Sequence, residues 1–129
     1  MGGKKRVLVC VTQQKTCERL IKKGAVICNE LDGEFFIIHV ALNGWKFLGN
    51  SHEGDALEYL FGISKSVGAE LTVLRSDNIV KTIVGFAKEN KITNIILGEP
   101  SDARNSDIIN ELRHRLSAEI DVVPSKGGE

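Results

Sequence analysis

The segment "RVLVCVTQQKTCERL" (Arg6–Leu20) gives the clearest indication of the fold. Its five consecutive apolar residues, Val7–Val11, predict a strand over residues 6–11 that is covered on both faces, as in the centre of a parallel sheet. A short polar stretch follows, and a helical pattern begins near Thr16. A strand, a short loop and a helix open many nucleotide-binding α/β domains. The loop here reads Thr-Gln-Gln-Lys and lacks glycine, so the segment predicts the fold and leaves the ligand open.

The same alternation of strand and helix continues along the chain. Apolar runs predict strands, and apolar residues at helical spacing predict the helices between them. The further predicted strands cover residues 34–42, 69–74, 93–98 and 119–124, and the predicted helices cover residues 16–31, 55–67, 78–89 and 105–116. Asp32-Gly33 and Gly68 are expected to end the first two helices. Ser76 or Asp77 is expected to cap the third helix.

The element order βαβαβαβαβ predicts an α/β fold with a doubly wound, five-stranded parallel sheet and helices on both faces, which is Rossmann-like. The expected strand order is 3-2-1-4-5. The order then reverses between the first and fourth strands, so a ligand crevice is expected outside Val11 and Gly98. Residues 1–129 are expected to form one domain, in which residues 1–5 and 125–129 are mobile.

Charge and cysteine content narrow the functional classes. Lys plus Arg (17) balances Asp plus Glu (17), so nothing indicates binding to nucleic acid or to an acidic membrane surface. No apolar run approaches the length of a membrane span. Cys10, Cys17 and Cys28 are odd in number and lack the spacing of metal ligands. We therefore expect reduced thiols, no bound metal and a cytoplasmic location.

Four segments resemble a known family: "RVLVCV" (6–11), "FFIIHV" (35–40), "IVGFAKENKITNIILG" (83–98) and "EIDVV" (119–123). On these segments the chain resembles a universal stress protein (UspA-like) domain from Arg6 to Pro124. It is most similar to the stress-protein domain of Kdp potassium-sensor histidine kinases. Those domains also have a Leu-Val-Cys-Val strand followed by "ERLI" and end with Ile-Asp-Val. The resemblance implies a small-ligand-binding or signalling module and a homodimer formed through the strand Glu119–Pro124.

The family's ATP-binding members carry the motif G-x2-G-x9-G-[S/T] after the fourth strand, and this chain departs from it. Gly98 matches the first glycine, but Ser101 stands at the second and Glu111 at the third. The best substitute for the Gly-Ser pair is Asn105-Ser106, seven residues past Gly98 instead of thirteen. The simpler interpretation of Asn105 or Ser106 is the cap of the last helix, because capping is the commonest use of these residue types at a helix start. The resemblance therefore implies an adenine nucleotide site in which ATP binding is weak or absent.

Some of the kinase domains bind a cyclic dinucleotide through a pattern like S-x-S-x20-F-T-A-x-Y. Thr12, Gln14, Phe35 and His39 hold its positions here, and only Phe35 keeps the residue type. His39 lies in an apolar strand, where a hydrogen-bonded structural histidine is the simpler interpretation. The resemblance thus implies a site in the same place with a different ligand. The residues expected to line it are Thr12, Gln13, Gln14, His39, Val40, Gly98, Ser101, Asn105 and Ser106.

Alternative functions remain open from the sequence. The chain could be the ligand-sensing stress-protein domain of a Kdp-type sensor kinase, or a flavin or electron-transfer domain of related architecture. Gly98 is explained equally well by close approach of a ligand and by a turn after the strand. There is no Walker loop, no supported Ser-His-Asp arrangement and no metal-ligand spacing. We therefore expect no catalytic residues and a protein that is not an enzyme.

Overall fold

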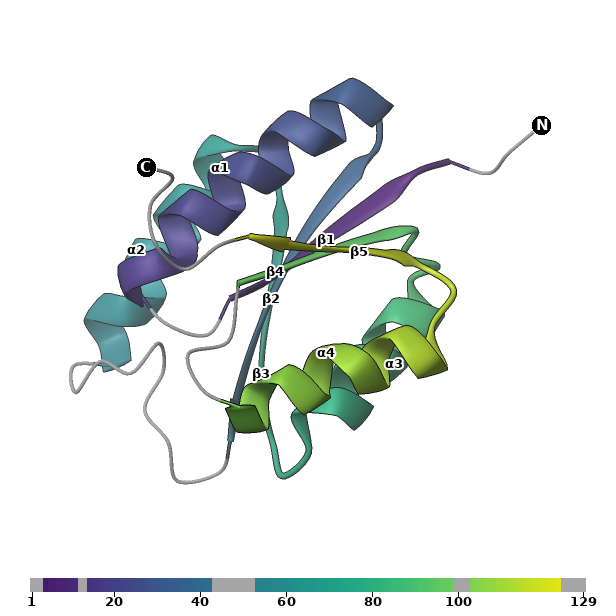
Figure 1. The fold of residues 1–129 in the computed structure, drawn as a ribbon. Helices are drawn as coiled ribbons and strands as arrows, with labels where there is room; N and C mark the ends of the chain where they lie inside the picture. Colours follow the sequence, from purple (N-terminus) through teal and green to yellow (C-terminus); the bar gives the residue numbers. More distant parts are fainter. Residues whose placement is uncertain (1–3, 12–13, 43–52, 99–102, 124–129) are drawn as a thin grey trace.

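The computed structural model describes residues 4–11, 14–42, 53–98 and 103–123 of the chain. Strands and helices alternate throughout, as the sequence predicts (Figure 1). The elements are β1 (Arg6–Val11), α1 (Gln14–Leu31), β2 (Glu34–Leu42), α2 (Glu53–Ser66), β3 (Glu70–Ser76), α3 (Ile79–Glu89), β4 (Asn94–Gly98), α4 (Ala103–Arg115) and β5 (Glu119–Val123). Within these ranges no helix combines the length and the apolar character needed to cross a membrane.

The strands form one parallel sheet in the order β3-β2-β1-β4-β5, which confirms the predicted topology. The apolar run of β1 is central: Leu8 lies opposite Phe36 of β2 on one side and Ile95 of β4 on the other. All of Val7–Val11 is buried, as expected for a strand that is paired on both edges and covered on both faces.

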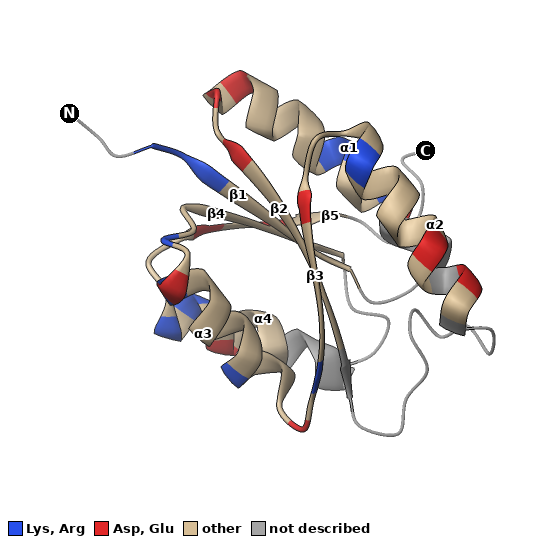
Figure 2. Ribbon diagram, turned by 180° about the vertical axis from the view of Figure 1, so that it is seen from behind, with Lys and Arg blue, Asp and Glu red and all other residues tan. Residues whose placement is uncertain are grey.

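The helices form a layer on each face of the sheet, with α1 and α2 on one side and α3 and α4 on the other (Figure 1). Successive residues of β1 alternate between these layers. Val7 and Val9 pack with Leu20 and Leu60 under α1 and α2, whereas Leu8 packs in the cluster of α3 and α4. Most Lys, Arg, Asp and Glu residues lie on the helices, in turns and near strand ends (Figure 2).

Three helices end in the same way before the chain turns into the next strand. The first or second residue after the helix has a positive φ, and the following N–H donates to a carbonyl five residues back, which is the Schellman arrangement. The left-handed residues are Asp32 (φ 53°), Gly68 (φ 71°) and Lys91 (φ 55°). The closing bonds are Gly33 N to Cys28 O (3.1 Å), Ala69 N to Ser64 O (2.9 Å) and Ile92 N to Ala87 O (2.9 Å). The predicted ends at Asp32-Gly33 and Gly68 are therefore confirmed.

Three helices begin two residues earlier than the sequence predicts. α1 begins at Gln14 and not near Thr16, α2 begins at Glu53 and not at Asp55, and α4 begins at Ala103 and not at Asn105. Asn105 and Ser106 consequently lie inside α4, and the expectation that one of them caps this helix is wrong. Polar residues in a first turn resemble a loop in sequence, because this turn has little apolar periodicity.

The cap of α3 also differs from the expectation, because Asn78 caps this helix. Its Oδ1 accepts a hydrogen bond from the backbone N–H of Lys81 at 3.0 Å. Ser76 instead supports the turn, and its Oγ accepts from the Asn78 N–H at 3.0 Å and from the Thr82 hydroxyl at 2.6 Å. Ser76, Asp77 and Asn78 are all good capping residues, so the sequence alone could not select among them.

The amino ends of β1 and β4 are joined by bonds between residues far apart in sequence. Thr93 N donates to Arg6 O at 2.9 Å, and Thr93 Oγ1 accepts from Arg6 N at 3.0 Å. These residues are 87 positions apart. The same end of β5 is fixed by Glu119 N, which donates to Thr93 O at 2.9 Å.

Candidate functional site

β1 and β4 end side by side at the carboxyl edge of the sheet. Cys10 lies opposite Leu97, and the two strands end one residue later, at Val11 and Gly98. The helices that follow these strands lie on opposite faces of the sheet. α1, which follows β1, begins at Gln14 on one face, and α4, which follows β4, begins at Ala103 on the other (Figure 1). This divergence is the predicted switch point, the place where doubly wound sheets bind their ligands.

The structure brings together part of the predicted site. Thr12, Gln13 and Ser101 lie outside the described residues. Gln14, Asn105 and Ser106 lie in the first turns of α1 and α4, and their side chains are outside the described part. His39, Val40 and Gly98 are fully described, and all three lie in the carboxyl halves of β2 and β4.

His39 is a buried polar residue with a defined partner. Its side chain is 2% exposed and lies beside β1, where His39 is in register with Val11. Nδ1 is 2.8 Å from the Val11 carbonyl oxygen. Because a carbonyl only accepts, Nδ1 carries the proton and donates. The interpretation of His39 as a hydrogen-bonded histidine agrees with this geometry.

Burial and charge change the acid–base behaviour of this histidine. Burial lowers the pKa of His39 below its usual value of 6.5, because the imidazolium loses its hydration. The bond to the Val11 carbonyl opposes this shift, and the positive charge of Arg75 lowers the pKa further. The neutral Nδ1–H tautomer is therefore favoured near neutral pH, and in this tautomer Nε2 is an acceptor.

Gly98 is a glycine that the backbone does not require. Its φ lies outside the left-handed region, so a side chain would not be strained there. A Cβ built on it would meet Leu20 Cδ1 of α1 at 3.4 Å, an ordinary van der Waals contact. Among the described residues only Leu20 comes within 4 Å of this Cβ, so neither the φ of residue 98 nor the described packing requires a glycine here.

Two further residues belong to this edge of the sheet. Val40 is buried in the cluster under α3 and α4, so its side chain belongs to the core and only its backbone can serve a ligand. Arg75, which the sequence interpretation missed, lies opposite Ala41 near the end of β3 and is exposed. The predicted strand stopped at Leu74, which placed Arg75 in a turn; the longer β3 carries its charge to the same edge.

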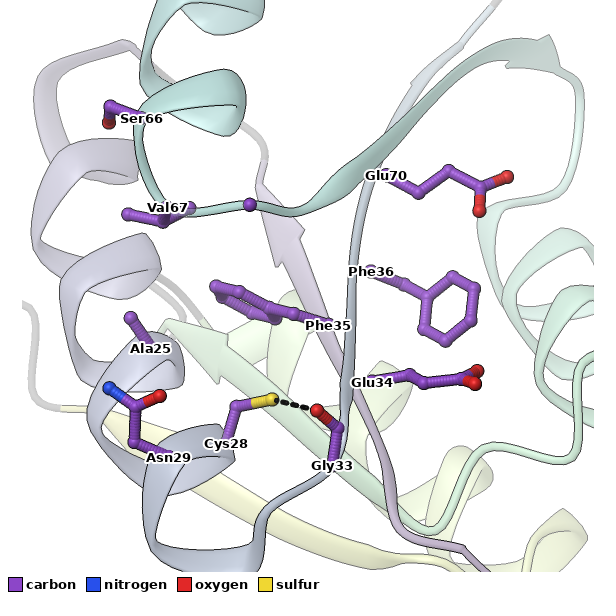
Figure 3. Close-up of a pocket in the computed structure, with 11 residues that line it drawn as sticks. Ala25, Cys28, Asn29, Gly33, Glu34, Phe35, Phe36, Ser66, Val67 and Glu70 are labelled. Atoms are coloured by element: carbon purple, nitrogen blue, oxygen red, sulfur yellow. Dashed lines mark hydrogen bonds between the residues drawn. The ribbon is translucent and has the colours of Figure 1, made fainter.

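An open groove of about 730 Å³ lies at the opposite, amino edge of the sheet (Figure 3). It is bounded by the ends of α1 and α2 and by the first residues of β2 and β3, and no sequence motif pointed to it. Phe35 points toward α1 and Val67, whereas Glu34, Phe36 and Glu70 point to the other side of the strand (Figure 3). The residues that line it are Ala25, Cys28, Asn29, Gly33, Glu34, Phe35, Phe36, Ser66, Val67, Gly68 and Glu70.

Several polar side chains that line this groove are hydrogen-bonded to nearby backbone or side-chain groups. The Cys28 thiol donates to Gly33 O at 3.1 Å, and the Ser66 hydroxyl donates to Ile63 O at 2.7 Å. Glu34 accepts from Arg6 Nε at 3.1 Å and lies 3.6 Å from Lys4 Nζ. The Cys28, Ser66 and Glu34 side chains are thus engaged with the helix ends and strand starts that bound the groove.

The described thiols lack the features of reactive cysteines. Burial raises the pKa of Cys10 to about 12. Burial also raises the pKa of Cys28, against the opposing effect of its bond to the Gly33 carbonyl. Both thiols are free, and they lie under opposite faces of the sheet. Among the described residues, no group of three or more His, Cys, Asp or Glu side chains could hold a metal ion.

Comparison with known sequences supports the Kdp resemblance. No family model matches the chain. The chain is 29% identical over 99 residues to a protein of Synechocystis described as a putative sensor protein KdpD. The match covers 77% of this chain and 26% of that protein, so the chain spans about a quarter of the length of this relative.

Comparison with solved structures shows the fold of universal stress proteins. UspA from Lactobacillus plantarum matches with a TM-score of 0.74 at 12% identity, covering 95% of this chain and 99% of that one. A universal stress protein in complex with cAMP matches at 0.72 and 14% identity, covering 97% and 100%. The Archaeoglobus fulgidus universal stress protein in complex with dAMP matches at 0.63 and 15% identity, covering 95% and 99%. The resemblance seen in the sequence is thus confirmed at the level of the fold.

Proposed function

We propose that this chain is a non-catalytic, universal stress protein-like signalling module that binds an adenine nucleotide where β1 and β4 end. The observation that carries the proposal is Gly98, which lies at the end of β4 although the described residues around it leave room for a side chain. A glycine that the backbone does not need is explained when another molecule approaches the main chain closely. Solved proteins with this fold that contain cAMP or dAMP support the choice of ligand.

The nucleotide is more reasonably a monophosphate or a cyclic nucleotide than ATP. Only residues 99–102 separate Gly98 from the start of α4, whereas the ATP motif requires a much longer loop. A shorter loop supplies fewer backbone N–H groups to a triphosphate. Each lost contact to a charged phosphate removes about 1.5–3 kcal/mol. The residues proposed to line the site are those predicted from the sequence, from Thr12 to Ser106.

The test is titration calorimetry of the wild type and two alanine variants with AMP, cAMP and ATP. Gly98→Ala adds one methyl group at the proposed site in a position that the fold accommodates. Gly85→Ala is the matched control, because a Cβ there meets nothing within 4 Å and lies on α3, away from the strand ends. We expect AMP or cAMP to bind the wild type and Gly85→Ala equally and to bind Gly98→Ala at least about tenfold more weakly.

Two results would count against the proposal in different ways. If none of the three nucleotides binds the wild type at millimolar concentration, the nucleotide function is wrong. If Gly98→Ala binds as tightly as the wild type, the ligand does not contact the main chain at Gly98 and the proposed location is wrong.

The similarity to the Synechocystis protein supports a second candidate: this chain as the ligand-sensing domain of a Kdp-type sensor. The match extends over 77% of this chain but only 26% of that protein, as expected for one module of a longer one. The natural transcript distinguishes the candidates. If its reading frame continues from these residues into further sensor segments, the sensor assignment is supported; a frame limited to these residues contradicts it.

We further propose that the module forms a homodimer through β5, a strand at one edge of the sheet. The hydrogen bonding between β4 and β5 shows which backbone groups of β5 point away from the sheet. Glu119 N donates toward β4, so in a strand the alternate residues Ile120 and Val122 direct their N–H groups away from β4. Pairing with a second β5 about a two-fold axis would satisfy these groups and cover an apolar, β-prone edge.

The direction of these N–H groups provides a selective test. Val122→Pro removes a donor that points away from the sheet, so the monomer should stay folded while the dimer is lost. Asp121→Pro is the matched control: it removes a donor that faces β4 and should destabilise the monomer itself. Analytical ultracentrifugation and circular dichroism report the two effects. A monomeric wild type at high concentration, or a folded Val122→Pro that still dimerises, contradicts the proposal.

A further inference from the structure

His39 is an unusual residue for its position in the sheet. Its strand neighbours Ile37, Ile38 and Val40 are apolar and buried, and His39 is 2% exposed among them. Burying an imidazole costs free energy that an aliphatic side chain would not cost, and its hydrogen bond only offsets this cost. The hydrogen bond between His39 and the Val11 carbonyl is therefore the feature that could explain why a histidine stands at this position.

That bond holds the last carbonyl of β1. Lys5 O accepts from Glu34 N of β2, so alternate β1 residues, including Val11, direct their carbonyls toward β2. His39 Nδ1 lies 2.8 Å from the Val11 oxygen. A carbonyl oxygen has two lone pairs, so this bond can be added to the ladder. Because the peptide unit is planar, an oriented Val11 carbonyl also orients the peptide plane in which the chain leaves the sheet.

We propose that His39 is a positioning residue for the site at the carboxyl edge: its Nδ1–H holds the Val11 carbonyl and sets the geometry of the β1 end against Gly98. The inference rests on the proposed function. It differs from a direct contact between His39 and the ligand, which would use Nε2. Burial of the ring against β1 and the distance to Val11 support the positioning role.

Three substitutions separate these roles. His39→Asn places an amide donor near the location of Nδ1 and can still reach the Val11 carbonyl. His39→Gln places its amide near the location of Nε2 and leaves that carbonyl without a side-chain donor. His39→Leu keeps an apolar side chain of similar size with no donor. Each variant is titrated with AMP by calorimetry, and its thermal unfolding is followed by circular dichroism at the same pH.

A positioning role predicts a specific order of affinities. His39→Asn should bind AMP within about threefold of the wild type, while His39→Gln and His39→Leu should bind at least about tenfold more weakly, measured where each variant is fully folded. If His39→Gln retains affinity and His39→Asn loses it, the ring contacts the ligand through Nε2 and the proposal is wrong. If all folded variants bind equally, the histidine only stabilises the fold and the proposal is equally wrong.

Hydrogen exchange tests the bond between His39 and the Val11 carbonyl without any ligand. His39→Leu should accelerate exchange of the Val11 backbone amide by at least about tenfold and leave the amide of Leu8 unchanged, because opening would be confined to the β1 end. His39→Asn should exchange like the wild type. If the wild type binds no AMP, the proposed function fails, and hydrogen exchange alone tests whether His39 holds the Val11 carbonyl. Unchanged exchange at Val11 in His39→Leu overturns that role.

Discussion

The backbone of Gly24 in α1 lies directly against the side chain of Val9 in β1. A Cβ on residue 24 would overlap Val9 Cγ2 and would lie 3.0 Å from the ring carbons Cε1 and Cζ of Phe35 in β2. Helix and sheet therefore approach each other at a distance that only glycine permits. Val9 and Phe35 are buried and packed from several sides, so they have little space into which to move.

We expect Gly24→Ala to lower the free energy of unfolding by about 1–3 kcal/mol, the usual cost of overpacking a core. Replacing a helical glycine by alanine ordinarily raises the free energy of unfolding. A decrease in Gly24→Ala would therefore indicate the close contact with Val9 and Phe35. The matched control is Gly85→Ala, in a helical position where a Cβ meets nothing within 4 Å. That variant should gain about 0.5–1 kcal/mol. Urea denaturation measures both; an unchanged or stabilised Gly24→Ala would contradict the close packing.

Lys91 and Gly68 have equivalent places at the ends of α3 and α2, with φ of 55° and 71°. A side chain is unfavourable in this left-handed conformation, and glycine is not. We expect Lys91→Gly to raise the free energy of unfolding by up to about 1 kcal/mol and Gly68→Ala to lower it by about 1 kcal/mol. Thermal unfolding of both variants is the check, and shifts of the same sign would contradict the shared helix ending.

Stability should depend on pH through His39. Its pKa is lowered in the folded state by burial and by the charge of Arg75, so the unfolded chain binds the proton more readily. The stability that comes from the neutral ring is therefore complete above about pH 6.5 and is lost as the pH falls from there toward the lowered folded-state pKa. Urea denaturation between pH 8 and pH 5 measures the change.

The control for this pH dependence is His39→Asn, which has no group that titrates at this position. The decrease in unfolding free energy below about pH 6.5 should be smaller in this variant than in the wild type. Equal slopes in the two proteins would mean that other groups cause the pH dependence.

Cys10 and Cys28 should resist thiol reagents in the folded protein. Burial raises the pKa of Cys10 to about 12, and the Cys28 thiol, with its raised pKa, donates to the Gly33 carbonyl. The thiolate is the reactive form, so neither group should react with a disulfide reagent at pH 8 until the protein opens. Measured in Cys17→Ser, the absorbance of the released thiol should appear only after guanidinium is added. Rapid reaction in buffer would show that one of these strands or helices opens easily.

Much of the fold could be predicted because the first strand has a clear pattern. Val7–Val11 is apolar at every position, which is typical of a strand covered on both faces, and the alternation of strands and helices that follows predicts the parallel topology. The remaining errors are local. α1, α2 and α4 begin two residues before their predicted starts because their first turns are largely polar, and Asn78 caps α3 from among three adjacent candidates. These choices depend on small differences in backbone geometry that residue type does not encode.

The site was less predictable than the fold. The predicted strand order correctly placed the ends of β1 and β4, at Val11 and Gly98, next to each other in the sheet. The hydrogen bond of His39 to the Val11 carbonyl requires the register of two strands, which the sequence does not specify. Arg75 was missed because β3 runs two residues beyond its predicted end. The predictions for Thr12, Gln13 and Ser101 concern residues outside the described part and stay predictions.

The bonds between Arg6 and Thr93 have a consequence for how the chain is synthesised. A ribosome makes Arg6 early, but its partner Thr93, which directly precedes β4, is made 87 residues later. Until β4 has left the ribosome, the apolar residues of β1 can pair on one side only, and the other edge stays available to any extended chain nearby. A transcript truncated before Thr93 would therefore yield a product that aggregates or is degraded, and full-length synthesis should depend on protection of that edge during elongation.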